Sequence, residues 1–444
     1  MDQRLDLESG TIHDLNKPVP GMWRFPKDHP ALCCIYRVPN CMRQVNPEAY
    51  TPQILLIGPL HHSLKSQALK SRGDMTDTKS MDYLNMERHK KIYLAEFKKR
   101  VGGENSIEGF TRTIEEDEEM IRESYSESTA WIESPEFVEM ILHDSVFILE
   151  FMLRNYEIDR SQKTGDPLMD EPCQGAMVRR DLGLLENQLP YFLLDKLFEP
   201  IIHTLADITF RELVMYIFDF TDKIGDDSKF RHFTDLSRCV LVETLPGNYI
   251  THEKIPELNE KYHAYKLHKG GVTFNAVDEE LSLDVLSLDV EFKNGCLNIP
   301  SFFVDGLSEM KLRNMMALEQ CHYANNTHVC DYIFFMDSLI DTEEDVALLV
   351  EKGIIKHFLG DIGSVATMVN RLSLGVLNFG SHYSVITKDV NSYYHNSWNK
   401  SRAVLKTVYF NNPWRGTATV AATLLLLLTL IQTMTSVMQV LPKK

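Results

Sequence analysis

The spacing of apolar residues predicts a chain built mainly from α-helices. Apolar positions recur every three or four residues over 83–100 and 134–154, which is the period of a helix with one face on a core. The same period continues over 182–198, where Pro190 interrupts it. Further helices are expected at 307–323, 331–339, 342–351, 362–374 and 385–410, the last ending at Asn412-Pro413.

Two regions depart from this period and predict strands. Residues 53–57 form a short apolar run that stops at Gly58-Pro59, as a buried strand would. After residue 270 the pattern alternates, and Asn294-Gly295 is a strong hairpin-turn signal between two alternating stretches. The predicted fold is therefore a mainly α, multi-helix globular domain with a small antiparallel β-hairpin unit.

A tandem repeat lies beside this hairpin. The pentapeptide Leu-Ser-Leu-Asp-Val occupies residues 281–285 and again 286–290. A shift of five residues inverts the two faces of a strand, so only one copy is expected to hold the native register. The other copy is expected to form an extended arm or a loop.

The last long stretch without a charge, 416–442, predicts a C-terminal transmembrane helix at 415–441. About 25 residues at ~1.5 Å each give roughly 37 Å, more than the ~30 Å hydrocarbon core of a bilayer. Leucines 424–428, with Leu430 and Ile431, together favour insertion by about 3 to 4 kcal/mol. The alternative is a helix buried inside the domain, but such helices seldom run this long without a charge.

One side of the predicted membrane helix is small and polar. Steps of three and four residues place the following residues on one seam: Ala418, Ala422, Leu425, Thr429, Gln432, Ser436 and Gln439. Small and polar groups favour close packing and hydrogen bonds between membrane helices. We expect the seam to pair with a second copy or a partner protein, with Gln432 as the central contact. The alternative is a chance alignment, because small and hydroxylated residues are common in such helices.

Charge is distributed unevenly along the chain. The formal net charge is −17, yet 391–444 contains no Asp or Glu and has six Lys and Arg residues. These six contribute +6, so the first 390 residues carry −23. An acidic body argues against nucleic acid as a partner, since binding to phosphate backbones depends on clustered Lys and Arg. The basic strip before the apolar segment suits membrane lipid with anionic headgroups.

The remaining features of the chain indicate its compartment. Eight sparse cysteines lack the spacing of a disulfide scaffold, and the first residues are polar and acidic rather than a signal peptide. We therefore expect a single-pass protein of the plasma membrane or an endomembrane, with its large N-terminal domain in the cytosol. The expected organisation is a flexible leader at 1–30, a mainly helical domain at 31–411 and the membrane helix. Residues 157–175 are a candidate boundary between two parts of the helical domain.

No motif in the sequence identifies a catalytic reaction or a bound cofactor. Phosphate loops, dinucleotide fingerprints, the hydrolase elbow and the zincin motif are absent. Four metal-ligating side chains occur within ten residues, namely Cys321, His322, His328 and Cys330, but they lack the spacing of a structural zinc site. Core cysteines with surface histidines are the preferred interpretation, and Thr342 with Asp345 predicts a capping box. We therefore predict no catalytic, cofactor or metal residues.

Two short clusters of polar residues lie within apolar parts of the sequence. Glu186, Asn187 and Gln188 lie in an apolar run before Pro190, and buried polar groups must be hydrogen-bonded. They predict a polar network that clamps a helix kink at this proline. His61 and His62 follow the Gly58-Pro59 turn, where a hydrogen-bonded pair is expected because adjacent histidines rarely bind one ion.

A series of motifs runs in order over about nine-tenths of the chain. The most specific are Ile35-Tyr-Arg-Val-Pro39, Ile57-Gly-Pro-x-His-His62, Met86-Glu87 with Lys90, Leu184-Leu-Glu-Asn-Gln-Leu-Pro190, Phe292-x-Asn-Gly-x-Leu-x-Ile-Pro300, Tyr332-Ile-Phe-Phe-Met-Asp337 and Asn412-Pro-Trp414. In these motifs the chain resembles the plant family catalogued as domain of unknown function 247. The resemblance implies a plant source, a mainly helical body and a C-terminal membrane helix. It implies no established activity or cofactor.

The resemblance also bears on function, because some relatives in grasses are associated with self-incompatibility. We therefore expect a tail-anchored recognition, signalling or scaffold protein that acts through protein contacts. The alternative is an enzyme whose polar pocket is built from His61, His62, Glu87 and Glu186, with Glu186 as a general acid. Convergence of these side chains in one deep pocket would favour the enzyme, and their dispersal would favour the scaffold.

Overall fold

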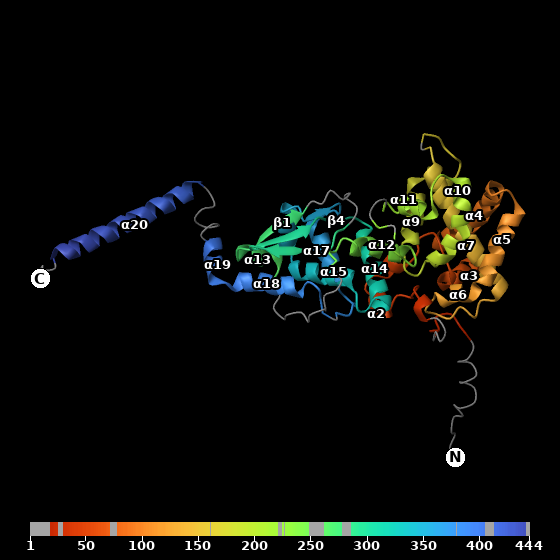
Figure 1. The fold of residues 1–444 in the computed structure, drawn as a ribbon, viewed down its shortest axis with the longest axis horizontal. Helices are drawn as coiled ribbons and strands as arrows, with labels where there is room; N and C mark the ends of the chain where they lie inside the picture. Colours follow the sequence, from red (N-terminus) through yellow and green to blue (C-terminus); the bar gives the residue numbers. More distant parts are fainter. Residues whose placement is uncertain are drawn as a thin grey trace, which may run out of the picture.

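The computed structural model of the chain describes residues 18–24, 30–71, 78–159, 161–220, 224–225, 227–247, 262–277, 286–378, 380–404 and 413–440. Figure 1 shows a body with two lobes, one made of helices alone and one that also contains the strands, and a separate helix α20. The mainly α fold class predicted from the sequence is confirmed.

The N-terminal lobe, residues 30–242, consists of helices. Its elements are η1 (Pro30–Leu32), α2 (Asn40–Arg43), η2 (Pro47–Tyr50), η3 (Pro59–His61), α3 (His62–Lys70), α4 (Thr78–Arg100), α5 (Glu104–Glu116), α6 (Glu118–Glu123), α7 (Ser134–Glu157), α8 (Pro167–Asp170), α9 (Pro172–Leu182), α10 (Tyr191–Leu205), α11 (Phe210–Ile217) and α12 (Phe233–Val242). The central helix is α7, which packs against α4, α5 and α11. Leu153, Leu168 and Val178 lie in one core, so this core continues across 157–175.

The C-terminal lobe, residues 262–404, adds two small sheets to its helices. Its helices are α13 (Ala264–Lys269), α14 (Ser308–His322), α15 (His328–Leu339), α16 (Glu343–Glu351), α17 (Ile362–Leu372), α18 (Ser384–His395) and α19 (Ser397–Val404). Its strands are β1 (Thr273–Val277), β2 (Glu291–Lys293), β3 (Cys296–Pro300), β4 (Phe302–Val304) and β5 (Ile355–His357). Most of its buried apolar residues form a second core, and α12 packs on α14 where the lobes meet.

The predicted hairpin is present. Strands β2 and β3 pair antiparallel through Asn294 and Gly295, whose φ angles of 52° and 80° are those of a tight primed turn. Strand β1 extends this sheet by parallel pairing with β3, and β4 pairs in parallel with β5 in a second sheet. The second copy of the pentapeptide repeat leads into β2 with Leu288 and Val290 buried, whereas the first copy lies outside the described residues.

The structure corrects several expected elements. Residues 54–57 are buried and Gln53 is half-buried, but the segment 53–57 forms no strand. The expected helix over 182–198 is two helices, because α9 ends at Leu182 and α10 begins at Tyr191. Between them Asn187 and Gln188 use their amides on backbone groups, which competes with helix formation. The expected helix over 385–410 divides at Asn396 into α18 and α19, and residues 405–410 lie outside the described part.

The ends of the chain are described only in part. Of the predicted leader, residues 18–24 are described, and there Arg24 pairs with Glu123 of α6. Helix α20 (Pro413–Val440) contains an apolar stretch, Thr417–Ser436, that is long and apolar enough to cross a membrane. No residue of that stretch is buried, unlike those of a core helix. The hydroxyls of Thr429 and Ser436 on the seam donate to carbonyl oxygens of their own helix.

Candidate functional site

The segment 53–58 is the centre of a buried polar arrangement that we call the clamp. The Asp181 carboxylate accepts hydrogen bonds from the backbone amides of Gln53, Ile54 and Leu55 at 2.8–3.0 Å. The Asn187 side chain accepts from the Ile57 amide at 2.6 Å and donates to the Leu55 carbonyl at 3.0 Å. The segment therefore satisfies its backbone with side chains from the 181–188 turn instead of with a neighbouring strand.

Glu186 anchors the preceding part of the chain. Its carboxylate accepts from the Val38 amide at 2.6 Å and pairs with the guanidinium groups of Arg37 and Arg43. Arg37 also binds Glu127 and the carbonyl of Leu60. Burial lowers the pKa of Arg37, but Glu127 and Glu186 together raise it above its usual value. Glu186 is therefore fully engaged in ion pairs and a backbone contact.

Gln188 joins the clamp to α12. Its side-chain amide donates to the carbonyls of Leu182 and Leu184 and accepts from the Phe233 amide at 3.0 Å. The backbone carbonyl of Gln188 lies so close to Gly58 that an added Cβ at position 58 would be 2.7 Å from it. With a φ of 71°, Gly58 is required here by both space and backbone conformation.

A buried cation closes the other side of the clamp. Lys90 is 1% exposed, and its ammonium donates to Asp144 and Glu87 at 2.6 Å each and to the Leu56 carbonyl. Burial lowers the pKa of Lys90, but the two carboxylates raise it above its usual value. Asp144 accepts in addition from the Gly58 amide at 2.9 Å. Glu87 is shared between Lys90 and Lys65.

The two histidines occupy different environments. His61 is buried, and its burial, together with the charges of Arg37, Arg43 and Lys90, lowers its pKa to about 3. His62 lies 2.8 Å from Glu136 and packs edge-on against Trp131. The expected hydrogen bond between the two rings is not among the contacts of the described residues. Of the six predicted residues, Glu186, Asn187 and Gln188 belong to the clamp, and Glu87 joins it through Lys90. His61 is buried, and His62 contacts Glu136 instead.

We expect Asn187→Ala and Glu186→Ala to destabilise the fold by about 1–3 kcal/mol each, because each leaves buried groups without partners. For Asn187 these groups are the Ile57 amide and the Leu55 carbonyl. Chemical denaturation of the chain ending at Trp414 measures the change, and Asn85→Ala, at an exposed amide on α4, is the matched control. Variants as stable as the parent would show that the clamp is not needed for folding.

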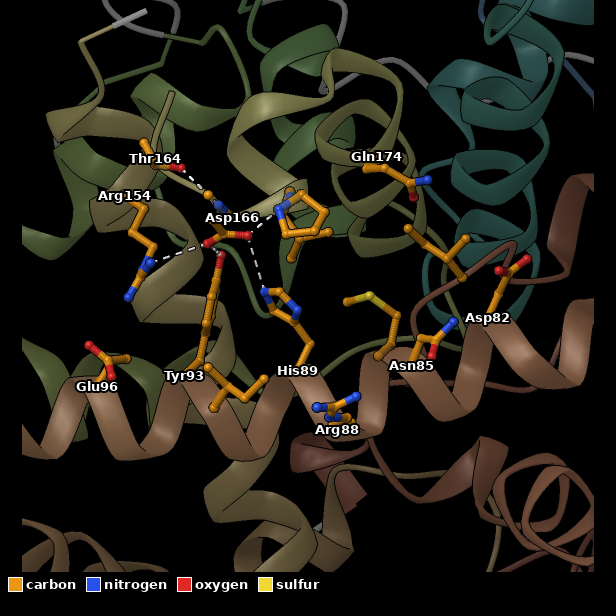
Figure 2. A pocket seen from close by; sticks show the side chains of 16 residues that line it. Asp82, Asn85, Arg88, His89, Tyr93, Glu96, Arg154, Thr164, Asp166 and Gln174 are labelled. Carbon is orange, nitrogen blue, oxygen red and sulfur yellow. Dashed lines mark hydrogen bonds and ion pairs between the residues drawn. The ribbon is translucent and has the colours of Figure 1, made fainter. Parts of the chain in front are cut away.

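A separate cavity of about 530 Å³ lies between α4, the end of α7 and the segment 164–168. Figure 2 shows Asp166 in this cavity, with Tyr93 and His89 of α4 and Arg154 of α7 directed toward it. The Tyr93 hydroxyl donates to Asp166 at 2.7 Å, and Nη1 of Arg154 lies 3.2 Å from the same oxygen. Nε2 of His89 is 3.2 Å from the other oxygen, without the alignment of a good hydrogen bond.

These contacts determine the charge of the cavity. Burial alone would raise the pKa of Asp166, but the contacts from His89, Tyr93 and the Leu168 amide lower it to about 2. Asp166 is thus ionised, and its negative charge lies beside the His89 ring. The lining residues include no Ser, Cys or Lys, and the Thr164 hydroxyl donates to Asp170. The cavity therefore places a histidine beside a carboxylate, without a Ser, Cys or Lys nucleophile among the described residues that line it.

The sequence analysis did not predict this cavity; its alternative pocket was built from other residues. His89 and Asp166 are 77 positions apart and carry no motif, so only the fold brings them together. His61, His62, Glu87 and Glu186 do not line it, nor do they line the cavities of about 400 and 510 Å³ elsewhere in the described chain. None of these three cavities therefore brings the four side chains together.

The cysteine and histidine cluster has a different arrangement from the one expected. His322 accepts or donates a hydrogen bond with the Tyr36 hydroxyl at 3.0 Å. His328 is buried rather than at the surface, and its ring stacks on His382 with centroids 4.8 Å apart. Cys330 is buried beside Glu319, which accepts from its amide. No group of three metal-ligating side chains occurs within the described ranges.

Comparisons with known proteins agree with the sequence motifs. The model of a family described as a plant protein of unknown function, domain of unknown function 247, matches residues 35–428. A UPF0481 protein of Arabidopsis thaliana is 26% identical over 93% of this chain and 88% of its own length. A second UPF0481 protein of the same plant is 30% identical over 37% of this chain and 31% of its own. No solved structure matches the chain.

Proposed function

The chain belongs to the plant family of domain of unknown function 247, and from this premise we propose a membrane-anchored recognition protein that acts through protein contacts. The observation that carries the proposal is α20, where a 20-residue apolar stretch has no buried residue. Seven large apolar side chains between Leu424 and Ile431 are each more than half exposed. Exposing such an apolar surface to water is unfavourable in free energy, whereas the hydrocarbon core of a bilayer removes it from water.

The part of the body nearest to α20 in sequence supports this anchoring. Trp398 of α19 and Trp414 at the start of α20 are 77% and 84% exposed, and tryptophan favours the membrane–water interface. Only eight residues, 405–412, separate the two helices, and they reach at most about 29 Å. The α19 end of the body therefore stays near the bilayer surface.

We place the body on the cytosolic side. All eight cysteines are free thiols, which suits a reducing compartment. The four basic residues before the apolar stretch outnumber the two after it, in agreement with the positive-inside rule. The polar groups that the sequence marked are used in the clamp, which supports a structural rather than a catalytic role for them.

Proximity labelling in plant cells tests the proposal. A labelling enzyme fused to the N-terminus of the full chain should mark a reproducible set of membrane-associated cytosolic proteins. The chain ending at Trp414 should lose most of that set, because it lacks the anchor. Identical sets for the two chains would contradict a role for the membrane, and labelled lumenal proteins would contradict the orientation.

The same experiment tests the seam of α20. The Gln432 side chain forms no hydrogen bond within the part of the chain that the structure describes. One interhelical polar contact in a bilayer contributes about 0.6–2 kcal/mol. Full-length Gln432→Leu should lose labelled partners, or copies of the chain itself, by about 3- to 30-fold at equal abundance. Leu424→Ala, on the opposite face, is the control and should leave the set unchanged. Equal sets for Gln432→Leu and the parent would leave the seam without a role.

A further inference from the structure

A cavity of about 400 Å³ lies where the two lobes meet. Its walls come from α9, α11 and α12 on one side and from β4 and α14 on the other, at the junction visible in Figure 1. It shares no residue with the cavity of Figure 2. Small-molecule sites have volumes of roughly 300–1,000 Å³ and often occur between domains. Its size and position are therefore those of a ligand site.

Both cores contribute apolar side chains to this cavity. Ile217 comes from the core of the N-terminal lobe, and Phe302, Met310 and Met315 come from the core of the C-terminal lobe. Aromatic and methionine side chains contact an apolar ligand well, and methionine adapts to its shape. The interior thus favours a ligand with an apolar body.

The hydroxyl groups of the lining are already satisfied by the protein. Thr234 donates to the Gly183 carbonyl at 3.1 Å, and Ser237 donates to the Phe233 carbonyl at 3.2 Å. Ser308 donates to Asp305 at 2.8 Å. Because these hydroxyls already donate within the protein, the charged side chains of the lining are the main recognition elements for a polar group of a ligand.

Two cations of the lining have no carboxylate partner among the residues that the structure describes. Arg180 pairs with Asp181 at 2.7 Å, but Arg179 contacts only the Asn155 amide oxygen, at 3.3 Å. Lys311 is exposed on α14 and forms no ion pair with any described residue. Arg179 and Lys311 thus line this cavity without a described ion pair, in a chain of net charge −17. They supply an attractive field for a negative group.

The lining also includes two carboxylates, Asp305 and Asp219. Asp305 accepts from the Leu307 amide and the Ser308 hydroxyl at the start of α14. Burial raises the pKa of Asp305, but these hydrogen bonds and the more distant Lys311 lower it overall. Asp219 is exposed to water just after α11. The lining thus holds three cations, Arg179, Arg180 and Lys311, against these two carboxylates, of which Asp305 is hydrogen-bonded at the start of α14.

We propose that this cavity binds an organic anion with an apolar body and one carboxylate, with the charge met by Arg179 and Lys311. The site goes beyond the proposed function, since membrane anchoring and the α20 seam play no part in it. The apolar body lies between Ile217 and the Phe302 side, and the carboxylate is at the cationic rim. A bound ligand would contact both lobes and stabilise their junction.

Calorimetric titration of the full chain in nanodiscs tests the site, with empty nanodiscs as the blank. The probes are 4-phenylbutyrate, its neutral amide 4-phenylbutyramide and the cation 4-phenylbutylammonium, which share one apolar body. The carboxylate should bind at one site, and the two analogues should bind at least tenfold more weakly, since a charge-assisted contact is lost. No saturable binding of the carboxylate up to millimolar concentration, or equal affinity of carboxylate and amide, would overturn the proposal.

Two variants locate the binding. Arg179→Gln with Lys311→Gln should weaken 4-phenylbutyrate about tenfold or more and abolish its preference over the amide. Lys91→Gln with Arg112→Gln removes two exposed cations of α4 and α5 that line neither this cavity nor that of Figure 2, and should change nothing. Ala176→Phe, which fills the cavity from α9, should prevent binding while the thermal midpoint stays within a few degrees. Full affinity in both cavity variants would place the ligand elsewhere and refute the site.

Discussion

Replacing Lys90 with methionine should destabilise the protein by about 3–5 kcal/mol, the largest effect expected of a single substitution in the body. Lys90 is buried, and its ammonium is the counter-charge of Asp144, whose side chain is 2% exposed. Methionine keeps the apolar stem but leaves that carboxylate without its cation, and the Leu56 carbonyl loses its donor. Denaturant unfolding of the chain ending at Trp414 measures the loss as a fall in midpoint.

Two further variants separate the charge from the volume of the side chain. Lys91→Met changes the neighbouring, exposed lysine and should stay within about 0.5 kcal/mol of the parent. Lys90→Met with Asp144→Asn should regain part of the loss, because asparagine is neutral and still accepts from the Gly58 amide. A Lys90→Met protein within about 1 kcal/mol of the parent would show that Asp144 is not an uncompensated charge.

Local signals in the sequence identified the elements that depend on neighbouring residues alone. The hairpin follows from Asn294-Gly295, because both positions need a positive φ that few other residue types adopt. The capping box of α16 follows from Thr342 and Asp345. The Thr342 side chain accepts from the Asp345 amide, and the Asp345 side chain accepts from the Thr342 amide. Helix period placed α4 and α14 within a few residues of their observed bounds.

The error at residues 53–57 has a different cause. An apolar run of this length is typical of a buried strand, because a buried backbone requires hydrogen-bond partners. Here the partners are Asp181 and Asn187, more than 120 positions later in the chain. Nothing in a single sequence indicates that a carboxylate will replace a strand. The same residues explain why the chain turns before Pro190 instead of continuing as a kinked helix.

The cavity around Asp166 was equally hidden, although its parts are ordinary. Asp166 caps α8 by accepting from the Leu168 amide, and such a residue in a polar loop carries no sign of a second role. His89 lies on the same helix as Lys90, yet the two side chains serve different sites. Pattern reasoning finds periodic faces, whereas this site joins α4 to a loop by tertiary packing alone.

The second large effect concerns the membrane. The full chain should resist carbonate extraction, whereas a chain with both Leu426→Arg and Leu427→Arg should appear in the supernatant. These leucines are 70% and 54% exposed at the middle of the apolar stretch. Each arginine at a helix centre costs about 2.5–3.5 kcal/mol on the insertion scale, so two exceed the roughly 3 to 4 kcal/mol that the leucine-rich run provides.

Position along the helix provides the control for that result, because the cost of a charge depends on its depth. Thr417→Arg lies at the end of the stretch, where a long cation reaches the headgroups, and this variant should remain in the pellet. The chain ending at Trp414 should be soluble, since it lacks the only stretch of the described residues that is apolar enough to span. Protease added to intact vesicles should digest the body of the full chain if that body is cytosolic. A double-arginine protein that stays in the pellet with the full chain would mean that the body itself binds the membrane tightly, and α20 would then not be the anchor.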